Sequence, residues 1–269
     1  MDQRAIGVFD SGLGGLTALR ELTALLPHEH IIYFGDTARV PYGTRSRETI
    51  INYARQDVSF LRSFDLKAIL IACGTVSTTA METLGAEFST PLFGVVEPAV
   101  AQAVAASVSG RIGLIGTPAT VGSGAFERAI LAHNSTAHVT SAACPLFVPL
   151  VENGRYEPDD KVVELVVAEY LQPLKAAGVD TLVLGCTHYP LLAEAIAAYM
   201  GEGVRLINTG AAAAQALAGF LREGDVLSDA TARGEQKFYV SDSPEGFERL
   251  ASIFLHTDVC GEVAQVTVG

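Results

Sequence analysis

The sequence predicts an α/β protein that consists of two similar lobes, each built on a mainly parallel sheet. Short β-branched runs alternate with longer segments of helical period along the 269 residues, as parallel strands joined by crossover helices do. Two strand-to-turn units also occur in each half of the chain, in the same order. A hydrophobic content of 49% is ample for buried cores.

The predicted strands are short apolar runs. In chain order they cover Ile6–Phe9, Ile31–Phe34, Ala68–Ala72, Leu92–Val96, Ile112–Ile115, Thr181–Leu184, Val204–Ile207 and Lys237–Val240. Helices are predicted between them where apolar residues recur every three or four positions. The helical stripes are Leu16, Leu19, Leu22 and Leu26; Ile50, Ala54, Val58 and Leu61; and Val162, Leu165, Val166 and Tyr170. A last helix is predicted at Pro244–Leu255.

An internal duplication places one cysteine in each lobe. The first half contains IGVFDSGLGG at Ile6–Gly15 and AILIACGT at Ala68–Thr75. The second half contains IGLIGTPATVGSG at Ile112–Gly124 and TLVLGCTH at Thr181–His188. Each half therefore has a cysteine at the end of a corresponding strand.

The lobe boundaries follow from where the chain crosses, near Glu97 and Gly210. Residues 1–97 and 210–269 are expected to form the first lobe, and residues 98–209 the second. Ligands of open α/β sheets bind beyond the carboxyl ends of the strands. The cleft between the lobes is therefore the expected active site.

Charge and hydropathy exclude several classes of partner. Eighteen basic and thirty acidic residues give a formal charge of -12, so nucleic acid and anionic membrane surfaces would be repelled. Met1–Arg4 leads straight into a strand without a secretory pattern, so a cytoplasmic location is expected. The longest charge-free stretch, Ala129–Val151, contains histidines and prolines. No transmembrane segment is predicted.

The four cysteines, Cys73, Cys144, Cys186 and Cys260, are widely spaced and form no CxxC pair. In a cytosolic chain this argues against disulfides and structural zinc, and each cysteine is by default a reduced, buried thiol. A metal site that uses Cys186 and His188 is a weak alternative, because no further ligands stand nearby in the sequence.

Cys73 and Cys186 nevertheless suit the racemisation of an amino acid. That reaction requires removal of the α-proton on one face and reprotonation on the other, which two bases on opposite faces perform in place. A thiol with an ordinary pKa of about 8.5 can act as acid or base. Cys73 precedes a predicted helix start, where the dipole and free amides would favour the thiolate.

Other polar residues near the strand ends are candidates for supporting roles. His188 can orient or share a proton with Cys186, and Thr187 offers hydroxyl and amide donors. Asp10 is interpreted as a carboxylate that tunes a proton-transfer group. The turn Gly12–Gly15 after it is also consistent with a simple capped turn, and it lacks the third glycine of a dinucleotide fingerprint.

Two loops and one further carboxylate complete the candidates. Tyr42 and the amides around Gly43 could hold a carboxylate, or the loop could be only a connection. Thr117 and Thr120 lie in the corresponding loop of the second lobe, with similar potential. Glu152 follows an apolar run and is a candidate buried carboxylate.

Six sequence blocks carry a resemblance to a known family. They are Gly7–Gly15, Tyr33–Asp36, Pro41–Gly43, Gly94–Pro98, Cys144–Glu152 and Gly185–Leu192. Together and in this order they closely resemble bacterial glutamate racemases, over essentially the full chain. The resemblance implies interconversion of L-glutamate and D-glutamate for peptidoglycan synthesis, without pyridoxal phosphate, metal or nucleotide. It also implies two flavodoxin-like lobes around a buried site, and a homodimer.

The resemblance also implies roles for residues. Cys73 and Cys186 correspond to the two acid/base cysteines, and assisting positions fall on Asp10, Glu152 and His188. Substrate-binding positions fall on Ser11, Pro41, Tyr42, Gly43, Thr75 and Thr187.

The chain departs from the family at Gly74, because the usual Ala-Cys-Asn-Thr reads Ala72-Cys73-Gly74-Thr75 here. The family's asparagine contacts substrate, so either a water or a different set of donors is expected beside Gly74. Asn208 is a second departure, where an aspartate often begins the turn. The sequence starts almost directly at the first motif, so the N-terminal extension that carries regulation in some relatives is expected to be missing.

Two other functions compete with this interpretation. A relative in the same superfamily could act on aspartate, a hydantoin or a malonate, although a decarboxylase of that group typically keeps one cysteine. A binding protein for a small acidic ligand would also close two α/β lobes on a cleft. Such a protein has no need of opposed thiols.

Overall fold

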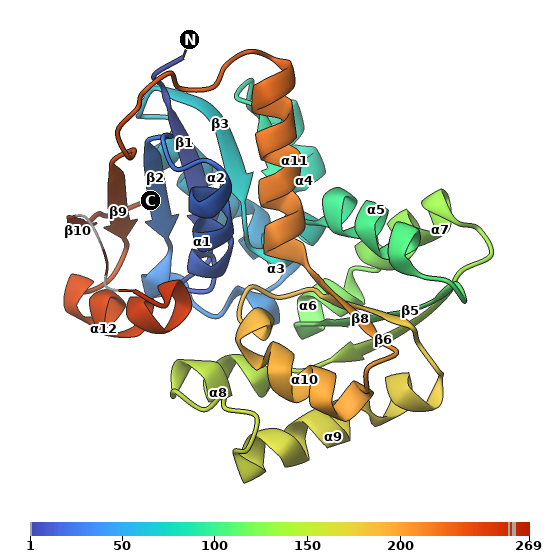
Figure 1. The fold of residues 1–269 in the computed structure, drawn as a ribbon. Helices are drawn as coiled ribbons and strands as arrows, with labels where there is room; N and C mark the ends of the chain where they lie inside the picture. Colours follow the sequence, from blue (N-terminus) through green and yellow to red (C-terminus); the bar gives the residue numbers. More distant parts are fainter. Residues whose placement is uncertain (1, 258, 260–261) are drawn as a thin grey trace.

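The fold combines two separate parallel sheets, each with helices on both faces (Figure 1). The structure is a computed structural model that describes residues 2–257, 259 and 262–269. The α/β class predicted from the sequence is confirmed. Cys260 lies outside the described residues, so its predicted state as a reduced thiol stays untested.

The strands belong to a six-stranded and a four-stranded sheet. They are β1 (Ala5–Asp10), β2 (Ile31–Gly35), β3 (Leu66–Ile71), β4 (Leu92–Gly94), β5 (Arg111–Gly116), β6 (His138–Ala143), β7 (Thr181–Leu184), β8 (Arg205–Asn208), β9 (Gln236–Val240) and β10 (Val263–Gln265). The larger sheet has the order β10-β9-β2-β1-β3-β4, and the smaller β6-β5-β7-β8. Every pairing in both sheets is parallel.

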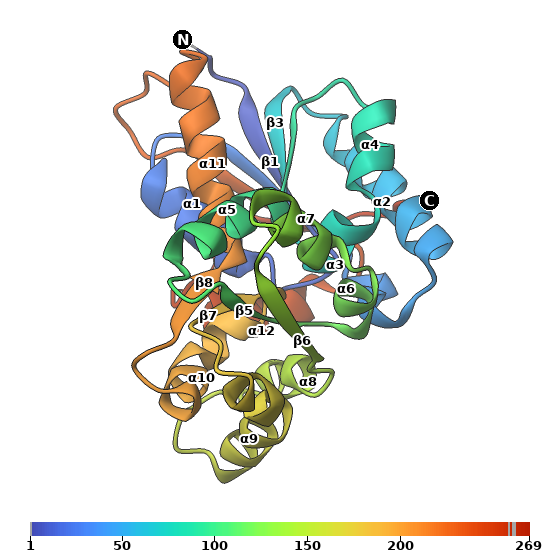
Figure 2. The same ribbon diagram turned by 90° about the vertical axis from the view of Figure 1, so that its right-hand side faces the viewer.

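The helices lie on both faces of each sheet. They are α1 (Leu16–Leu25), α2 (Arg47–Leu61), α3 (Gly74–Thr79), α4 (Met81–Glu87), α5 (Val96–Ala106), α6 (Pro118–Gly122), α7 (Ala125–His133), α8 (Phe147–Glu152), α9 (Lys161–Ala176), α10 (Ala193–Met200), α11 (Thr209–Glu223) and α12 (Pro244–Leu255). Short 3-10 turns occur at Thr37–Arg39, Tyr42–Thr44 and Tyr189–Leu192. Helices α1 and α11 cover one face of the larger sheet, and α2 and α4 the other (Figure 2).

The smaller sheet lies between α5 and α7 on one face and α9 and α10 on the other (Figure 2). The helices that the structure describes are too short or too polar to serve as bilayer spans. The lobe boundaries predicted near Glu97 and Gly210 fall in the first turns of α5 and α11 and stay a prediction.

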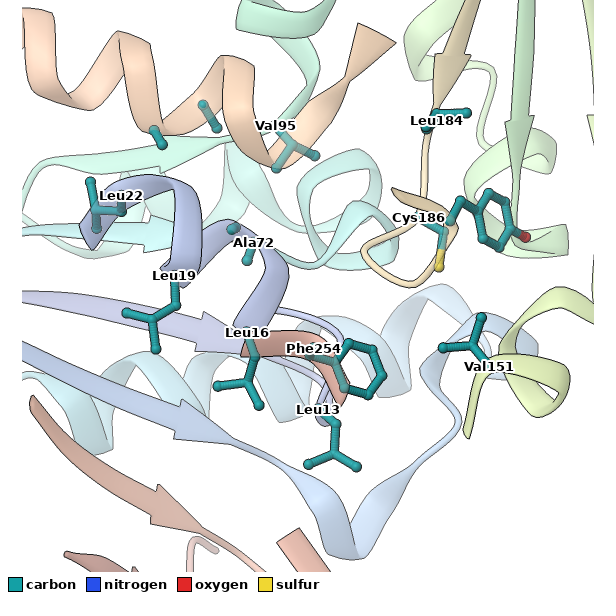
Figure 3. Packing of buried hydrophobic residues seen from close by; sticks show 14 of the residues in the cluster. Leu13, Leu16, Leu19, Leu22, Ala72, Val95, Val151, Leu184, Cys186 and Phe254 are labelled. Carbon is teal, nitrogen blue, oxygen red and sulfur yellow. The ribbon is translucent and has the colours of Figure 1, made fainter. Parts of the chain in front are cut away.

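Burial explains why the central strands were recognisable in the sequence. All six residues of β3 are buried, as expected for a parallel sheet that is covered on both faces. One buried apolar cluster extends from Leu16 on α1 to Val151 on α8, and so joins the two sheets. Figure 3 shows Phe254 of α12 beside Leu16, in the same part of this cluster as Cys186.

Three elements differ from the prediction. Strand β6 was not predicted because its sequence, HVTSAA, is small and polar, and no residue in it is buried. Strand β10 was also missed, since it contains only three residues at the edge of the larger sheet. The fourth predicted strand is shorter than expected, because Val96 begins α5.

Candidate active site

A cavity of about 370 Å³ lies where the carboxyl ends of strands from both sheets meet. It is lined by Ser11 after β1, Cys73 after β3, Thr117 after β5 and Cys186 after β7. The two cysteines, which are 113 positions apart in the chain, are therefore brought to one cavity.

Most of the predicted site residues line this cavity. They are Ser11, Pro41, Tyr42, Gly43, Cys73, Gly74, Thr75, Thr117, Glu152, Cys186, Thr187 and His188. Asp10 and Thr120 do not line it, although both are buried beside it. Cys144 and Val148 also line the cavity, and neither is among the site residues predicted from the sequence. The sequence feature that could have identified both residues is the block Cys144–Glu152, which is one of the six blocks that resemble the family.

Cys73 is held as a neutral thiol. It lies at the N-terminal end of α3, and its Sγ is 3.2 Å from the Oγ of Ser11. Burial and, to a smaller extent, the nearby Asp10 carboxyl raise the pKa of Cys73 to about 12, and the hydrogen bond with Ser11 offsets only part of this. The expectation of a thiolate at this helix start was wrong, because α3 has only six residues and desolvation outweighs its amides.

Cys186 lies beside a histidine that carries a positive charge. The Nδ1 of His188 is 3.9 Å from the Sγ of Cys186, and its Nε2 is 3.0 Å from the Oε1 of Glu152. Burial alone would lower the pKa of His188, but its interactions with Cys186 and Glu152 raise that pKa to about 10. At neutral pH an imidazolium therefore stands next to the Cys186 sulfur.

Asp10 is a buried carboxyl behind the two thiols. Its Oδ2 accepts the backbone N–H of Gly12 at 2.9 Å, while its Oδ1 has no hydrogen-bond partner among the described residues. Burial raises the pKa of Asp10, and the charge of His188 partly offsets this. Asp10 does not itself line the cavity, and its carboxyl raises the pKa of the nearby Cys73 thiol.

Three threonine hydroxyls meet at one wall of the cavity. The Oγ1 of Thr117 lies 3.1 Å from that of Thr75 and 3.0 Å from that of Thr120. The backbone N–H of Thr120 also donates to the Thr117 hydroxyl at 3.2 Å. Thr120 thus supports the other two hydroxyls from behind, and Thr75 and Thr117 present polar groups to the cavity.

A buried ionic network holds the loop that carries Pro41, Tyr42 and Gly43. The guanidinium of Arg39 donates to Asp36 at 2.6 Å and to Asp57 at 2.6 Å. The hydroxyl of Tyr42 donates to Asp36 and lies 2.9 Å from Asp57 Oδ2. This hydroxyl is therefore bonded within the network, while Tyr42 also lines the cavity, and its role in holding a substrate carboxylate stays a prediction.

Comparison with known proteins identifies the family. A sequence model described as Asp/Glu/Hydantoin racemase matches residues 14–217. A glutamate racemase from Geobacter metallireducens is 47% identical over 268 residues, which cover 100% of this chain and 98% of that protein. The chain belongs to the Asp/Glu/Hydantoin racemase family.

Solved structures of this racemase family share the fold over nearly the whole chain. The glutamate racemase of Francisella tularensis in complex with D-glutamate has a TM-score of 0.90 and 38% identity, and covers 99% of this chain and 98% of its own. The glutamate racemase of Thermus thermophilus in complex with beta-chloro-D-alanine has a TM-score of 0.88 and 42% identity, with the same coverage. The cavity between the sheets is thus the candidate active site of a racemase-family protein.

Proposed function

We propose that the protein is a glutamate racemase that interconverts L-glutamate and D-glutamate by a two-base mechanism. The observation that carries this proposal is the shared cavity of Cys73 and Cys186, which reach it from the ends of β3 and β7 in separate sheets. Family membership supports the reaction class, and the glutamate racemases among the relatives support the substrate.

In the proposed mechanism the two cysteines exchange the roles of base and acid during one turnover. Cys186, beside the His188 imidazolium, takes the α-proton of a bound amino acid as its thiolate becomes a thiol. The neutral thiol of Cys73 then gives its proton to the opposite face of the same carbon. After this turnover Cys73 is the thiolate and Cys186 the thiol, which is the state required for the reverse reaction. A single pair of sulfurs therefore serves both enantiomers.

The polar groups around the cavity suit the two carboxylates of glutamate. The hydroxyls of Ser11, Thr75, Thr117 and Thr187 line it, and the backbone near Gly43 adds amide donors. Fixed donors in an enclosed site hold an anion despite a formal charge of -12 on the whole chain. In the roles we propose, these residues bind substrate, while Asp10, Glu152 and His188 assist the thiols.

The wider setting of the reaction is also part of the proposal. D-glutamate formed here would supply peptidoglycan synthesis, and the chain would act as a homodimer with lobes formed by residues 1–97 with 210–269 and by residues 98–209. A cytoplasmic location fits a mechanism that needs reduced thiols, because cytosolic reductants maintain them. The supply of D-glutamate is tested by whether this gene allows a strain that requires D-glutamate to grow without it. The homodimer is tested by the molecular mass that light scattering measures.

The direct test follows the enantiomers and the α-proton together. Purified protein is incubated with L-glutamate in deuterated water without added cofactor, and circular dichroism and α-deuterium incorporation are recorded. Loss of optical rotation with one deuterium per inverted molecule is expected. The same assay with L-aspartate distinguishes a different racemase, and binding without turnover would indicate a binding protein.

Cysteine variants identify the reacting groups. Cys73→Ala and Cys186→Ala are each expected to remove racemisation, because either change leaves one face of the α-carbon without a proton carrier. Cys144→Ala is the matched control, since it removes the third thiol of the same cavity, whose Sγ is directed to the Ala142 carbonyl at 3.7 Å. Racemisation that persists in the double variant of Cys73 and Cys186 would refute the mechanism.

A further inference from the structure

Thr17 donates a hydrogen bond to the turn that carries Cys186 and His188. It lies on α1, which covers the larger sheet, whereas the turn follows β7 of the smaller sheet. The Oγ1 of Thr17 is 2.9 Å from the carbonyl oxygen of Thr187, and both residues are buried. The contact therefore joins α1 to the peptide that links Thr187 to His188.

The turn itself has no donor for the carbonyl of Thr187. The carbonyls on either side, those of Cys186 and His188, each accept the backbone N–H three residues later, at 3.1 and 3.2 Å. For Thr187 the residue three positions later is Pro190, which has no N–H. A buried carbonyl that lacks a donor destabilises the fold. Among the residues that the structure describes, Thr17 supplies the donor that Pro190 cannot.

The hydroxyl of Thr17 is available for this contact. Its Oγ1 is also 2.9 Å from the carbonyl oxygen of Gly14, but that oxygen already accepts the backbone N–H of Thr17 at 3.0 Å. A Cβ added to Gly14 would lie within 3.0 Å of the side chains of both Thr187 and His188. The start of α1 therefore packs directly against the ring of His188 and the peptide before it.

We propose that Thr17 is a positioning residue that orients His188 between Cys186 and Glu152. This inference rests on the two-thiol mechanism proposed above, in which His188 assists Cys186. The side chain of His188 begins at the peptide that Thr17 holds, so rotation of that peptide moves the imidazole. Its nitrogens lie 3.9 Å from the Cys186 sulfur and 3.0 Å from the Glu152 carboxylate, and both interactions weaken as these distances grow.

The role of the hydroxyl can be separated from the rest of the side chain. Thr17→Val keeps the branched shape and removes the donor, whereas Thr17→Ser keeps the donor and removes the methyl group. Thr23→Val is the matched control on the same helix. The Thr23 hydroxyl donates to the Leu19 carbonyl of α1 itself at 2.9 Å, and Thr23 does not line the cavity.

The first measurement is the rate of racemisation. The kcat and KM for both enantiomers of glutamate are compared among the wild type and the three variants. In Thr17→Val we expect kcat to fall on the order of tenfold with KM changed by less than about threefold, because misplacement by about 1 Å commonly costs about 100-fold in rate. Thr17→Ser and Thr23→Val should stay within about threefold of the wild-type kcat.

The second measurement is the pKa of His188, from NMR titration of protein with labelled histidine. Interactions with Cys186 and Glu152 raise this pKa to about 10 against the effect of burial, and the Asp10 carboxyl also interacts with the imidazole. In Thr17→Val the pKa should fall by at least about half a pH unit, because the ring is displaced from these groups while it stays buried. It should not move in Thr23→Val.

Several outcomes would overturn the positioning role. A folded Thr17→Val with the kcat and the His188 pKa of the wild type would do so, even if its stability were lower. A Thr17→Ser variant as slow as Thr17→Val would also do so, because the hydroxyl would then not be the group that matters. If Thr17→Val does not fold, a crystal structure of the wild type with D-glutamate decides, because the bond from Thr17 to Thr187 must persist in it. An inactive wild type would instead refute the proposed function, and the NMR titration would still test the position of His188.

Discussion

Arg39 is expected to contribute far more to stability than an exposed arginine in an ion pair of similar geometry. It bridges Asp36 and Asp57, whose side chains are both 0% exposed, at 2.6 Å each. Removing one partner of a buried ion pair typically costs about 3–5 kcal/mol, because the remaining charge is left without compensation. Arg55 pairs with Glu87 at the surface, where the side chains are 41% and 37% exposed, and solvent screening leaves such a pair with little effect on stability.

Urea unfolding of Arg39→Ala and Arg55→Ala at pH 7 and pH 5 tests this difference. Burial already raises the pKa of Asp57, and the loss of Arg39 raises it further. A carboxyl with a raised pKa in the folded state takes up a proton as pH falls, so the Arg39→Ala penalty should shrink at pH 5. Adding Asp57→Asn should restore part of the lost stability at pH 7. Equal free energies of unfolding for the two arginine variants, or a penalty independent of pH, would refute this reasoning.

Three further predictions concern the site itself. Glu152→Gln should lower the pKa of His188, so the alkaline limb of the kcat profile should move down by about one pH unit; an unmoved limb contradicts this. In Gly14→Ala, the added Cβ would clash with the side chains of Thr187 and His188, so kcat should fall at least about tenfold. An unchanged kcat would contradict this prediction. Phe254→Ala, which removes a buried ring packed edge-on against His188, should cost about 3–5 kcal/mol in thermal unfolding, and a loss below about 1 kcal/mol would argue against that packing.

The central strands and both cysteines could be located from the sequence because each signal is local. Strands such as β3 are buried along their whole length, so they form continuous apolar runs that any scan detects. The cysteines stand at the ends of two such runs, and the carboxyl-end rule then places both near a ligand. Strands β6 and β10 lacked this signal, because edge strands need no continuous apolar sequence.

The protonation states and close contacts of the site depend on residues that are distant in the chain. Cys73 is neutral because folding buries it beside Asp10, which no pattern around Cys73 reveals. Tyr42 turns its hydroxyl to Asp57 because α2 happens to pass behind its loop. The approach of Gly185 to Gly74 likewise depends on how two sheets meet, and a sequence does not encode that distance locally.

In the proposed two-base mechanism, the enzyme leaves each turnover in a different form from the one it entered. A molecule that has just inverted one enantiomer carries its negative charge on Cys73, the sulfur whose pKa burial and Asp10 raise to about 12. That form accepts the product enantiomer, and before it can accept the original substrate again Cys73 must gain a proton and Cys186 must lose one. In the proposed mechanism, net flux at saturating substrate therefore depends on this exchange of protons between the sulfurs as well as on the chemistry at carbon.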